Sequence, residues 1–477
     1  MITRIISRCL AIRSKLLGLM LNGSETRNPA ISKTLVTVER RRSCDIPLGM
    51  DLDCPDINNR LNMRIGIDDT DSPRGMCTTY LGAVLGKRLA RAGIAVREAR
   101  LVRLNPNVPW KTRGNAAVCL VAEGSPKKAF RLACNTVGEL SDLGHEHTHP
   151  GVVVSGDDLP VEFYRKAVQG FCTLDEAQAV LDEAGALSRG YKQKRGLIGA
   201  TAAACSNFDD ATYELLAYRD PASWGTPRFV ERESLFSADL HTYPHTWDTV
   251  DRENDLVVCV PHTPDPVLFG IRGERPGWVA LAREEVVSER PSLEQVWITN
   301  QGTDAHLVPA ISPEFEEGCS YLLAGAVGSL PVTHRGGHVS FTLASGYRCL
   351  TCMAYEPTRG FRGVVRGLLP GDRVRVAGSY KGGSINLEKL QVVSAPPLRI
   401  ARPPVCGRCG KRMTSAGTDK GYKCRRCGGR ESAPEILEES RVIAPGWYEV
   451  PPSARRHLAR PLCRGLRQAL LSLVPCP

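Results

Sequence analysis

The feature that most restricts how this chain can fold is a pair of Cys-X-X-Cys motifs near its C-terminus. Cys406 and Cys409 form the first motif, Cys424 and Cys427 form the second, and fourteen residues separate the two. Four thiolates at this spacing, with a glycine after each motif, are typical of a structural zinc ribbon. Since the protein would supply all four ligands, the sequence predicts a closed Zn²⁺ site that is structural and not catalytic.

A second feature is a strand followed by an acidic loop and a helix. The apolar strand that begins at Met63 runs into Asp68, Asp69 and Asp71, and the next helix is predicted to start at Thr78. Three carboxylates this close repel one another unless a cation lies between them, and oxygen ligands suit Mg²⁺. A helix start also favours an anion such as phosphate. An acidic turn with a helix cap explains the same residues, so both interpretations stay open here.

Two further loops combine basic residues with glycine. Lys111 and Arg113 lie on a short loop between two predicted strands, and Arg195, Gly196 and Gly199 precede an alanine-rich helix. Glycine lets the backbone approach a ligand, and the arginine fork can bind phosphate through two hydrogen bonds. We regard both loops as candidate phosphate-binding segments, with a plain basic hairpin turn as the alternative for the first.

The middle of the chain predicts two more units. Strands and helices follow one another without an internal repeat over residues 206–310, which suggests a compact α+β unit. Residues 311–397 contain five predicted strands, with a short helix between the third and the fourth. That order is typical of an OB-fold, an open barrel whose face binds single-stranded nucleic acid.

Composition restricts the class of protein. A chain of 477 residues is too long for one hydrophobic core, so several domains are expected. The formal charge of +11 favours a polyanionic partner, and nucleic acid is the leading candidate. The apolar runs fall short of the roughly 20 residues that a membrane span needs, so no membrane partner is expected. Most of the eighteen cysteines are scattered singly, which favours the reducing cytoplasm.

The two ends of the chain carry weaker signals. Residues 1–62 show no sustained period, and we interpret them as an extension that is disordered or that reflects a start codon assigned too early. Residues 441–477 form a basic tail whose arginines fit a possible amphipathic helix. Such a tail would hold RNA or be disordered.

Seven motifs follow one another in order along the chain: Gly66-Ile-Asp-Asp-Thr-Asp-Ser-Pro-Arg-Gly-Met-Cys-Thr-Thr-Tyr80, Arg103-Leu-Asn-Pro, Lys111-Thr-Arg-Gly-Asn115, Arg195-Gly-Leu-Ile-Gly-Ala200, Tyr213-Glu-Leu-Leu-Ala-Tyr-Arg219, Asp265 to Glu274 and Thr299-Asn-Gln-Gly-Thr-Asp304. Through these motifs, the chain from Met63 to about Ser440 closely resembles the archaeal tRNA-Ile 2-agmatinylcytidine synthetase family. One departure is Gln193-Lys194, where the family would be expected to have an asparagine and a small residue.

The resemblance implies a multidomain α+β protein. It would have a kinase-like α/β domain that binds ATP (63–205), a ferredoxin-like domain (206–310), an OB-fold β-barrel (311–397) and a C-terminal zinc ribbon (398–440). The implied enzyme is an ATP-dependent ligase that attaches agmatine to C2 of the wobble cytidine in the CAU anticodon of tRNA-Ile. The C2 oxygen would first be phosphorylated, and the modified base would pair with A, which allows AUA decoding. No obligate protein partner is implied.

The resemblance also assigns roles to residues. Asp68, Asp69 and Asp71 would hold Mg²⁺ and ATP and take part in catalysis, and Thr78 would become phosphorylated. The other expected ATP-binding residues are Thr70, Lys111, Arg113, Arg195, Gly196 and Gly199. Two hypotheses from other classes compete with this ligase: an OB-fold and zinc-ribbon protein that binds nucleic acid without catalysis, and a kinase with an appended RNA-binding half.

Overall fold

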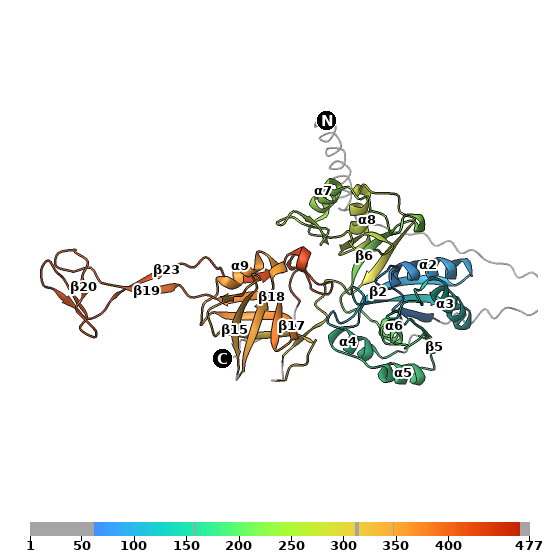
Figure 1. The fold of residues 1–477 in the computed structure, drawn as a ribbon, viewed down its shortest axis with the longest axis horizontal. Coiled ribbons are helices and arrows are strands. Elements are labelled where there is room, and N and C mark those ends of the chain that lie inside the picture. Colours follow the sequence, from blue (N-terminus) through green and yellow to red (C-terminus); the bar gives the residue numbers. More distant parts are fainter. Residues whose placement is uncertain (1–61, 157–158, 311–313, 347, 468–477) are drawn as a thin grey trace, which may run out of the picture. The chain divides into compact units, whose positions relative to one another are not determined.

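A computed structural model describes residues 62–156, 159–310, 314–346 and 348–467 (Figure 1). The predicted N-terminal extension therefore lies outside the described residues except for Asn62, and so does the last part of the predicted tail. The described residues contain no helix long and apolar enough to cross a membrane.

The N-terminal half of the described chain is an antiparallel sheet with helices on both faces (Figure 1). Its strands, in the order β5-β4-β1-β3-β2, are β1 (Asn62–Asp68), β2 (Ala95–Arg103), β3 (Ala116–Glu123), β4 (Gly151–Ser155) and β5 (Leu187–Gly190). One face packs against α2 (Thr78–Arg91) and α3 (Pro126–Leu140), and the other against α4 (Val161–Gln169), α5 (Leu174–Glu183) and α6 (Gly196–Ala204). The predicted strand, loop and helix from Met63 onward are confirmed.

Strand β1 shows why this arrangement forms. Met63, Ile65 and Ile67 are fully buried and pack with α2 and α3, as expected for alternating residues of a strand. Gly66 lies on the opposite face, where a Cβ atom would come within 2.0 Å of the Ala200 carbonyl oxygen of α6. The absence of a side chain at this position therefore lets α6 pack directly against the strand that carries the acidic loop.

The strands of residues 206–310 extend this sheet and do not form a sheet of their own. They are β6 (Thr212–Tyr218), β7 (Thr246–Trp247), β10 (Val267–Gly273) and β11 (Leu293–Thr299), in the order β11-β6-β10-β7. A short ladder joins the two parts, because β11 pairs in parallel with β2 through Ile298–Arg100 and Thr299–Leu101. Helices α7 (Arg232–Thr242) and α8 (Pro276–Glu285) pack with β6 and β10. Strands β8 (Val250–Asp251) and β9 (Leu256–Val257) form a separate hairpin.

The next unit is a closed barrel of five strands. They are β13 (Ser320–Val327), β15 (Val339–Ser345), β16 (Arg348–Ala354), β17 (Arg373–Lys381) and β18 (Ser384–Ser394), with α9 (Phe361–Arg366) between β16 and β17. Pairing of β13 with β15 closes the ring. The short strands β12 (Leu307–Pro309), β14 (Val332–Thr333) and β24 (Gly446–Glu449) add to its edges. The five predicted strands and the helix are all confirmed.

Residues after the barrel form an antiparallel pair and then a small three-stranded sheet. The pair consists of β19 (Leu398–Arg402) and β23 (Glu435–Glu439). Between them lie β20 (Thr414–Ser415), β21 (Tyr422–Lys423) and β22 (Arg430–Glu431). Of the predicted zinc ligands, Cys406 and Cys409 precede β20, and Cys424 and Cys427 lie between β21 and β22. Chain segments of this size bury little apolar surface, so a metal is expected to supply most of their stability.

The prediction of an amphipathic helix after residue 440 is wrong for the described part, 441–467. This segment contains β24 and the single 3₁₀ turns Pro452–Ala454 and Leu462–Arg464, because Pro451, Pro452 and Pro461 prevent a continuous helix. Three of its arginines pair with carboxylates of distant segments. Arg455 pairs with Asp248, Arg460 with Asp210, and Arg464 with both Asp210 and Glu274.

A buried carboxylate of the barrel is hydrogen-bonded to the loop before it. Glu388 of β18 accepts a hydrogen bond from His306 at 2.9 Å. Burial raises the pKa of this carboxyl, but His306 and Arg456 lower it by more, so the pKa falls to about 2. A carboxyl whose pKa is lower in the folded state stabilises the protein above its unfolded pKa, and this contribution is lost as the pH falls toward the folded pKa.

We therefore expect Glu388→Gln to destabilise the protein at pH 7 by up to about 3 kcal/mol and to have much less effect near pH 3. Thermal melting of both proteins between pH 3 and pH 7 measures this difference. An equal loss of stability at all these pH values would show that the glutamine only disturbs packing.

Candidate active site

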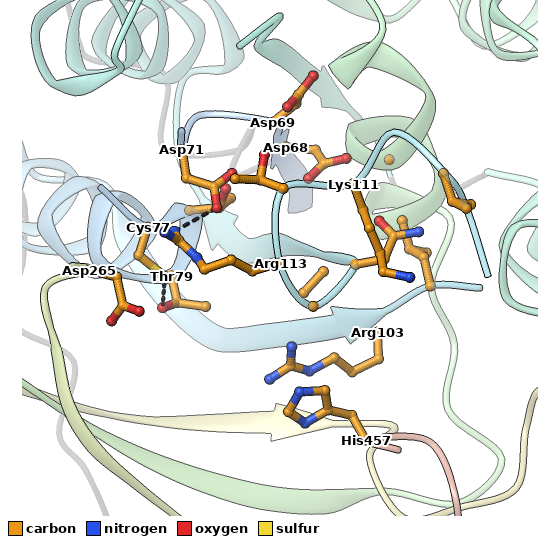
Figure 2. Close-up of a pocket in the computed structure, with 18 of the residues that line it drawn as sticks. Asp68, Asp69, Asp71, Cys77, Thr79, Arg103, Lys111, Arg113, Asp265 and His457 are labelled. Atoms are coloured by element: carbon orange, nitrogen blue, oxygen red, sulfur yellow. Dashed lines mark hydrogen bonds and ion pairs between the residues drawn. The ribbon is translucent and has the colours of Figure 1, made fainter. Parts of the chain in front are cut away.

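A cavity of about 370 Å³ opens where the acidic loop, the loop 105–115, the start of α6 and strands β6 and β10 meet (Figure 2). Eight of the ten residues predicted to act in catalysis or ATP binding line it: Asp68, Asp69, Asp71, Thr78, Lys111, Arg113, Arg195 and Gly199. The remaining two, Thr70 and Gly196, are buried directly behind this lining. The fold thus brings together loops that lie more than a hundred residues apart in the sequence.

Each of the two basic loops pairs with one aspartate of the acidic loop. Arg113 contacts the Asp71 carboxylate at 2.6 Å (Figure 2), and Arg195 lies 3.6 Å from Asp69. Arg113 also donates to the backbone carbonyl of Met76 on the same loop. These contacts bring the three predicted segments together at one cavity.

The acidic loop carries more negative charge than these arginines neutralise. Burial and the neighbouring carboxylates raise the pKa of Asp68 well above its usual value and that of Asp69 to about 7. Burial also raises the pKa of Asp71, although Arg113 opposes the shift. Carboxylates under this repulsion favour a bound cation, which would let all three ionise together.

The start of α6 fits against the acidic loop because it consists of small residues. A Cβ atom at Gly199 would come within 1.9 Å of the Asp68 carboxylate oxygen, and one at Gly196 within 2.8 Å of the Asp68 carbonyl oxygen. Lys192 and Lys194 just before this helix adopt positive φ angles of 53° and 61°, a conformation that asparagine adopts more readily. The departure from the family pattern at residues 193–194 therefore falls on a strained turn.

Gly199→Ala should displace the Asp68 carboxylate and lower catalytic activity by about 10²-fold, since a shift of about 1 Å in a catalytic group has an effect of that size. Gly138→Ala is the matched control, because α3 leaves nothing within 4 Å of an added Cβ there. The control should retain full activity and gain up to about 1 kcal/mol of stability. Steady-state rates and thermal melting measure both effects. Full activity of Gly199→Ala would show that the position of Asp68 is not critical.

Thr78, the predicted site of phosphorylation, begins α2 and is almost completely buried. Its hydroxyl lies 3.0 Å from the hydroxyl of Thr70, and the two form a hydrogen bond. Thr79 lies beside it, with its hydroxyl 3.0 Å from the Cys77 sulfur. Thr70 therefore supports Thr78 from behind, while Thr78 itself lines the cavity.

Sequence reasoning did not assign a role to several other charged groups of the cavity. Arg103, Glu214, Asp265, Arg272 and His457 all line it, and Figure 2 shows Arg103 and His457 away from Asp69. Arg272 contacts Glu214 at 3.1 Å and donates to His457 Nδ1 at 2.8 Å. The positions of Arg103, Glu214 and Asp265 inside the matching motifs were an available signal. His457 gave no such signal, because it lies in residues 441–477, which the sequence analysis interprets as a basic tail.

The four cysteines of the predicted ribbon converge as expected. Sulfur atoms of Cys406, Cys409, Cys424 and Cys427 all lie within 4.8 Å of one another, a geometry that suits one tetrahedral Zn²⁺. Backbone N–H groups lower the pKa of Cys424 to about 6, which favours the thiolate form that binds metal. Within the described ranges, this is the single group of three or more potential ligands that converges so closely; the three aspartates do not. A magnesium ion at the three aspartates would need oxygen ligands from a phosphate as well.

Comparison with known proteins identifies the family. The TiaS TCKD domain model matches residues 64–131, the TiaS FLD domain model matches 194–306, and the TiaS C-terminal zinc ribbon domain model matches 403–443. The chain is 48% identical to the tRNA(Ile2) 2-agmatinylcytidine synthetase TiaS of Methanocorpusculum labreanum, over 84% of this chain and 97% of that protein. It is 43% identical to TiaS of Archaeoglobus fulgidus, with the same coverage.

Solved structures agree with this result. The complex of TiaS with tRNA(Ile2) and ATP is similar to this chain with a TM-score of 0.79 and 40% identity, over 86% of this chain and 98% of that one. The complex with tRNA(Ile2), AMPCPP and agmatine gives a TM-score of 0.76 and 39% identity, over 85% and 97%. The chain therefore belongs to the tRNA(Ile2) 2-agmatinylcytidine synthetase (TiaS) family.

Proposed function

We propose that this protein uses ATP to attach agmatine to tRNA-Ile2, as the names of its relatives state for them. The observation that carries the proposal is the single cavity in which an acidic loop, two basic loops and the start of α6 meet. Relatives have been crystallised with ATP and tRNA(Ile2), and with an ATP analogue and agmatine. A protein that only binds nucleic acid would not require this cavity.

Within this proposal, the parts of the fold take the following names. Residues 63–205 are the kinase-like domain, 206–310 the ferredoxin-like domain, 311–397 the OB-fold and 398–440 the zinc ribbon. The barrel with α9 between its third and fourth strands supports the OB assignment. The OB-fold and the ribbon hold the tRNA through its shape and its phosphates, and the enzyme acts in the cytoplasm.

The acidic and basic loops have different roles in the binding of ATP. Asp68, Asp69 and Asp71 hold Mg²⁺, which neutralises phosphate charge when it is bound. Arg113 and Arg195 already lie beside these carboxylates, so they are placed to contact the same phosphates. Thr78 accepts a phosphoryl group through its hydroxyl, and Thr70 orients that hydroxyl.

The reaction proceeds at C2 of the wobble cytidine of the CAU anticodon. An oxo group leaves poorly, so transfer of the γ-phosphoryl group of ATP to the C2 oxygen converts it into a phosphate ester, from which phosphate is a better leaving group. Water then cleaves the bond between the α- and β-phosphates of the remaining ADP, so that ATP ends as AMP and two phosphates. The primary amine of agmatine, after losing a proton, then attacks C2, and phosphate departs with the former C2 oxygen. The cytidine must leave the anticodon stack to enter the cavity. The product pairs with A, so the tRNA reads AUA.

Agmatine is a dication near neutral pH and needs a carboxylate that is not already neutralised. Glu214 contacts Arg272 and accepts a hydrogen bond from Gln301, so its charge is compensated. Asp265 also lines the cavity, and its nearest cation is Arg228 at 3.6 Å. We assign the first contact with the substrate cation to Asp265 on this basis.

Incubation of the protein with ATP, agmatine and tRNA-Ile2 tests the proposal. We expect AMP to form and the wobble cytidine to gain the mass of agmatine less that of water. Binding of the tRNA without AMP or a mass gain would favour the non-catalytic nucleic-acid-binding protein. Autophosphorylation that does not depend on RNA, with no change in the cytidine, would favour the kinase.

A further inference from the structure

A second cavity of about 270 Å³ lies beside the active-site cavity. Arg103, Leu104, Lys111, Gly114, Asn115 and His457 line both cavities, so the two are neighbours that share a wall. The remaining lining residues are Pro106, Arg456 and Leu458. Two of these, Arg456 and Leu458, belong to the C-terminal segment that had been expected to form a basic tail.

The charged groups of this second cavity are all basic. Arg103, Lys111 and Arg456 line it, and none of its described lining residues is a carboxylate. Burial lowers the pKa of the Lys111 amine, and the charge of Arg456 lowers it further, which shows that the cations are close enough to repel one another. Such a group of cations favours an anion.

Arg103 keeps one buried donor without a partner in the described part of the chain. Arg103 approaches the Glu214 carboxylate only to 3.6 Å, and its buried Nε has no hydrogen-bond partner. Arg456 donates to Asn107 at 2.8 Å and lies 3.5 Å from Glu388. Unsatisfied buried donors are costly, so the site is built for a ligand that accepts hydrogen bonds.

His457 adds a further donor to the shared wall. Its Nδ1 accepts a hydrogen bond from Arg272 at 2.8 Å, and burial between Arg103 and Arg272 holds its pKa well below the usual value. The ring is therefore neutral with its proton on Nε2. A Cβ atom at Gly114 would come within 2.9 Å of Arg103 Nη1 and 3.2 Å of His457 Nε2, so the glycine keeps both donors accessible.

We propose that this second cavity binds a backbone phosphate of the tRNA next to the cytidine that enters the active-site cavity. The inference rests on the proposed function, because a flipped nucleotide stays joined to its two flanking phosphates. Sites that enclose a whole small molecule measure roughly 300–1,000 Å³, so this smaller cavity suits a phosphate and part of a sugar. The phosphates of ATP are the competing source, but Asp68 to Asp71, Arg113 and Arg195 form a separate group for them.

Replacement of Arg456 by glutamine in the full-length protein tests this assignment. The dissociation constant for tRNA-Ile2 should rise about 5- to 10-fold, and the salt dependence of binding should weaken by about 0.7 in slope, as expected for one lost contact to a single-strand phosphate. Binding of ATP with Mg²⁺ should not change. Arg456→Lys should restore most of the affinity. Arg131→Gln, an exposed residue of α3, is the control for a loss of the same charge elsewhere.

A tRNA with neutral methylphosphonate linkages on both sides of the wobble cytidine locates the phosphate. The wild-type protein should bind it 5- to 10-fold more weakly than normal tRNA, whereas Arg456→Gln should bind both equally. Weaker ATP binding with unchanged tRNA binding would assign the cavity to ATP and overturn the inference. Unchanged binding of both ligands would also overturn it. These measurements need no agmatine transfer, so they stay separate from the test of the proposed function.

Discussion

Asp69→Asn is expected to reduce agmatine transfer about 10³-fold while the dissociation constant for tRNA stays within about twofold of wild type. The amide has nearly the same size, so packing is preserved, but it removes an ionisable oxygen from the group that would hold Mg²⁺ with ATP. The Asp69 carboxylate also lies 3.6 Å from Arg195, which is placed to contact the same phosphates. The substitution would therefore also remove the carboxylate partner of Arg195. Rates of AMP formation and tRNA titrations measure the two quantities.

Asp182→Asn is the matched control, because this aspartate is exposed near the end of α5 and accepts a hydrogen bond from Gln178. It should leave both rate and affinity unchanged. A parallel loss of activity and tRNA binding in Asp69→Asn would mean that the acidic loop is structural. If Asp69→Asn retained full activity, Asp69 would not be a ligand of the metal.

Loss of the zinc site should unfold residues 398–440 and weaken tRNA binding at least about 10-fold while ATP turnover continues. Structural zinc supplies roughly 10–16 kcal/mol in isolated ribbons and fingers, more than this small segment gains from burial. Cys424→Ser removes one of the four converging ligands. A ZRD-deleted mutant of TiaS has been crystallised in complex with agmatine.

Cys349→Ser provides the control for the zinc experiment. Cys349 and Cys352 form another Cys-X-X-Cys pair, but on strand β16 Cys349 is exposed and Cys352 is buried, because residues three apart on a strand face opposite sides. The control should keep its zinc content and tRNA affinity. Unchanged tRNA affinity of Cys424→Ser, measured together with its zinc content, would discard the role of the ribbon in RNA binding.

Much of the fold could be predicted because local patterns determine it. The alternation of Ile65 and Ile67 identifies a strand, and the spacing of the four ribbon cysteines identifies a metal site. The joining of β2 to β11 could not be predicted in this way. It depends on a short parallel ladder between strands almost two hundred residues apart, and no local pattern encodes it.

The site was predictable on one side only. The acidic and basic loops carry glycine and charge in combinations that point to phosphate, and the structure brings them together at Asp68 to Asp71. His457 was missed because the arginines around it suggested an RNA-binding tail. Their partners, such as Asp248 for Arg455, lie in distant segments, so the sequence alone did not show that the segment is folded.

The most direct test of the proposed reaction follows the C2 oxygen of the wobble cytidine. A tRNA-Ile2 labelled with ¹⁸O at this position is incubated with the protein, ATP and agmatine, and the released phosphate is examined by mass spectrometry. Phosphorylation of the C2 oxygen predicts that the label appears in inorganic phosphate in proportion to the agmatine attached. Agmatine transfer with the label in water, or retained in the tRNA, would contradict it.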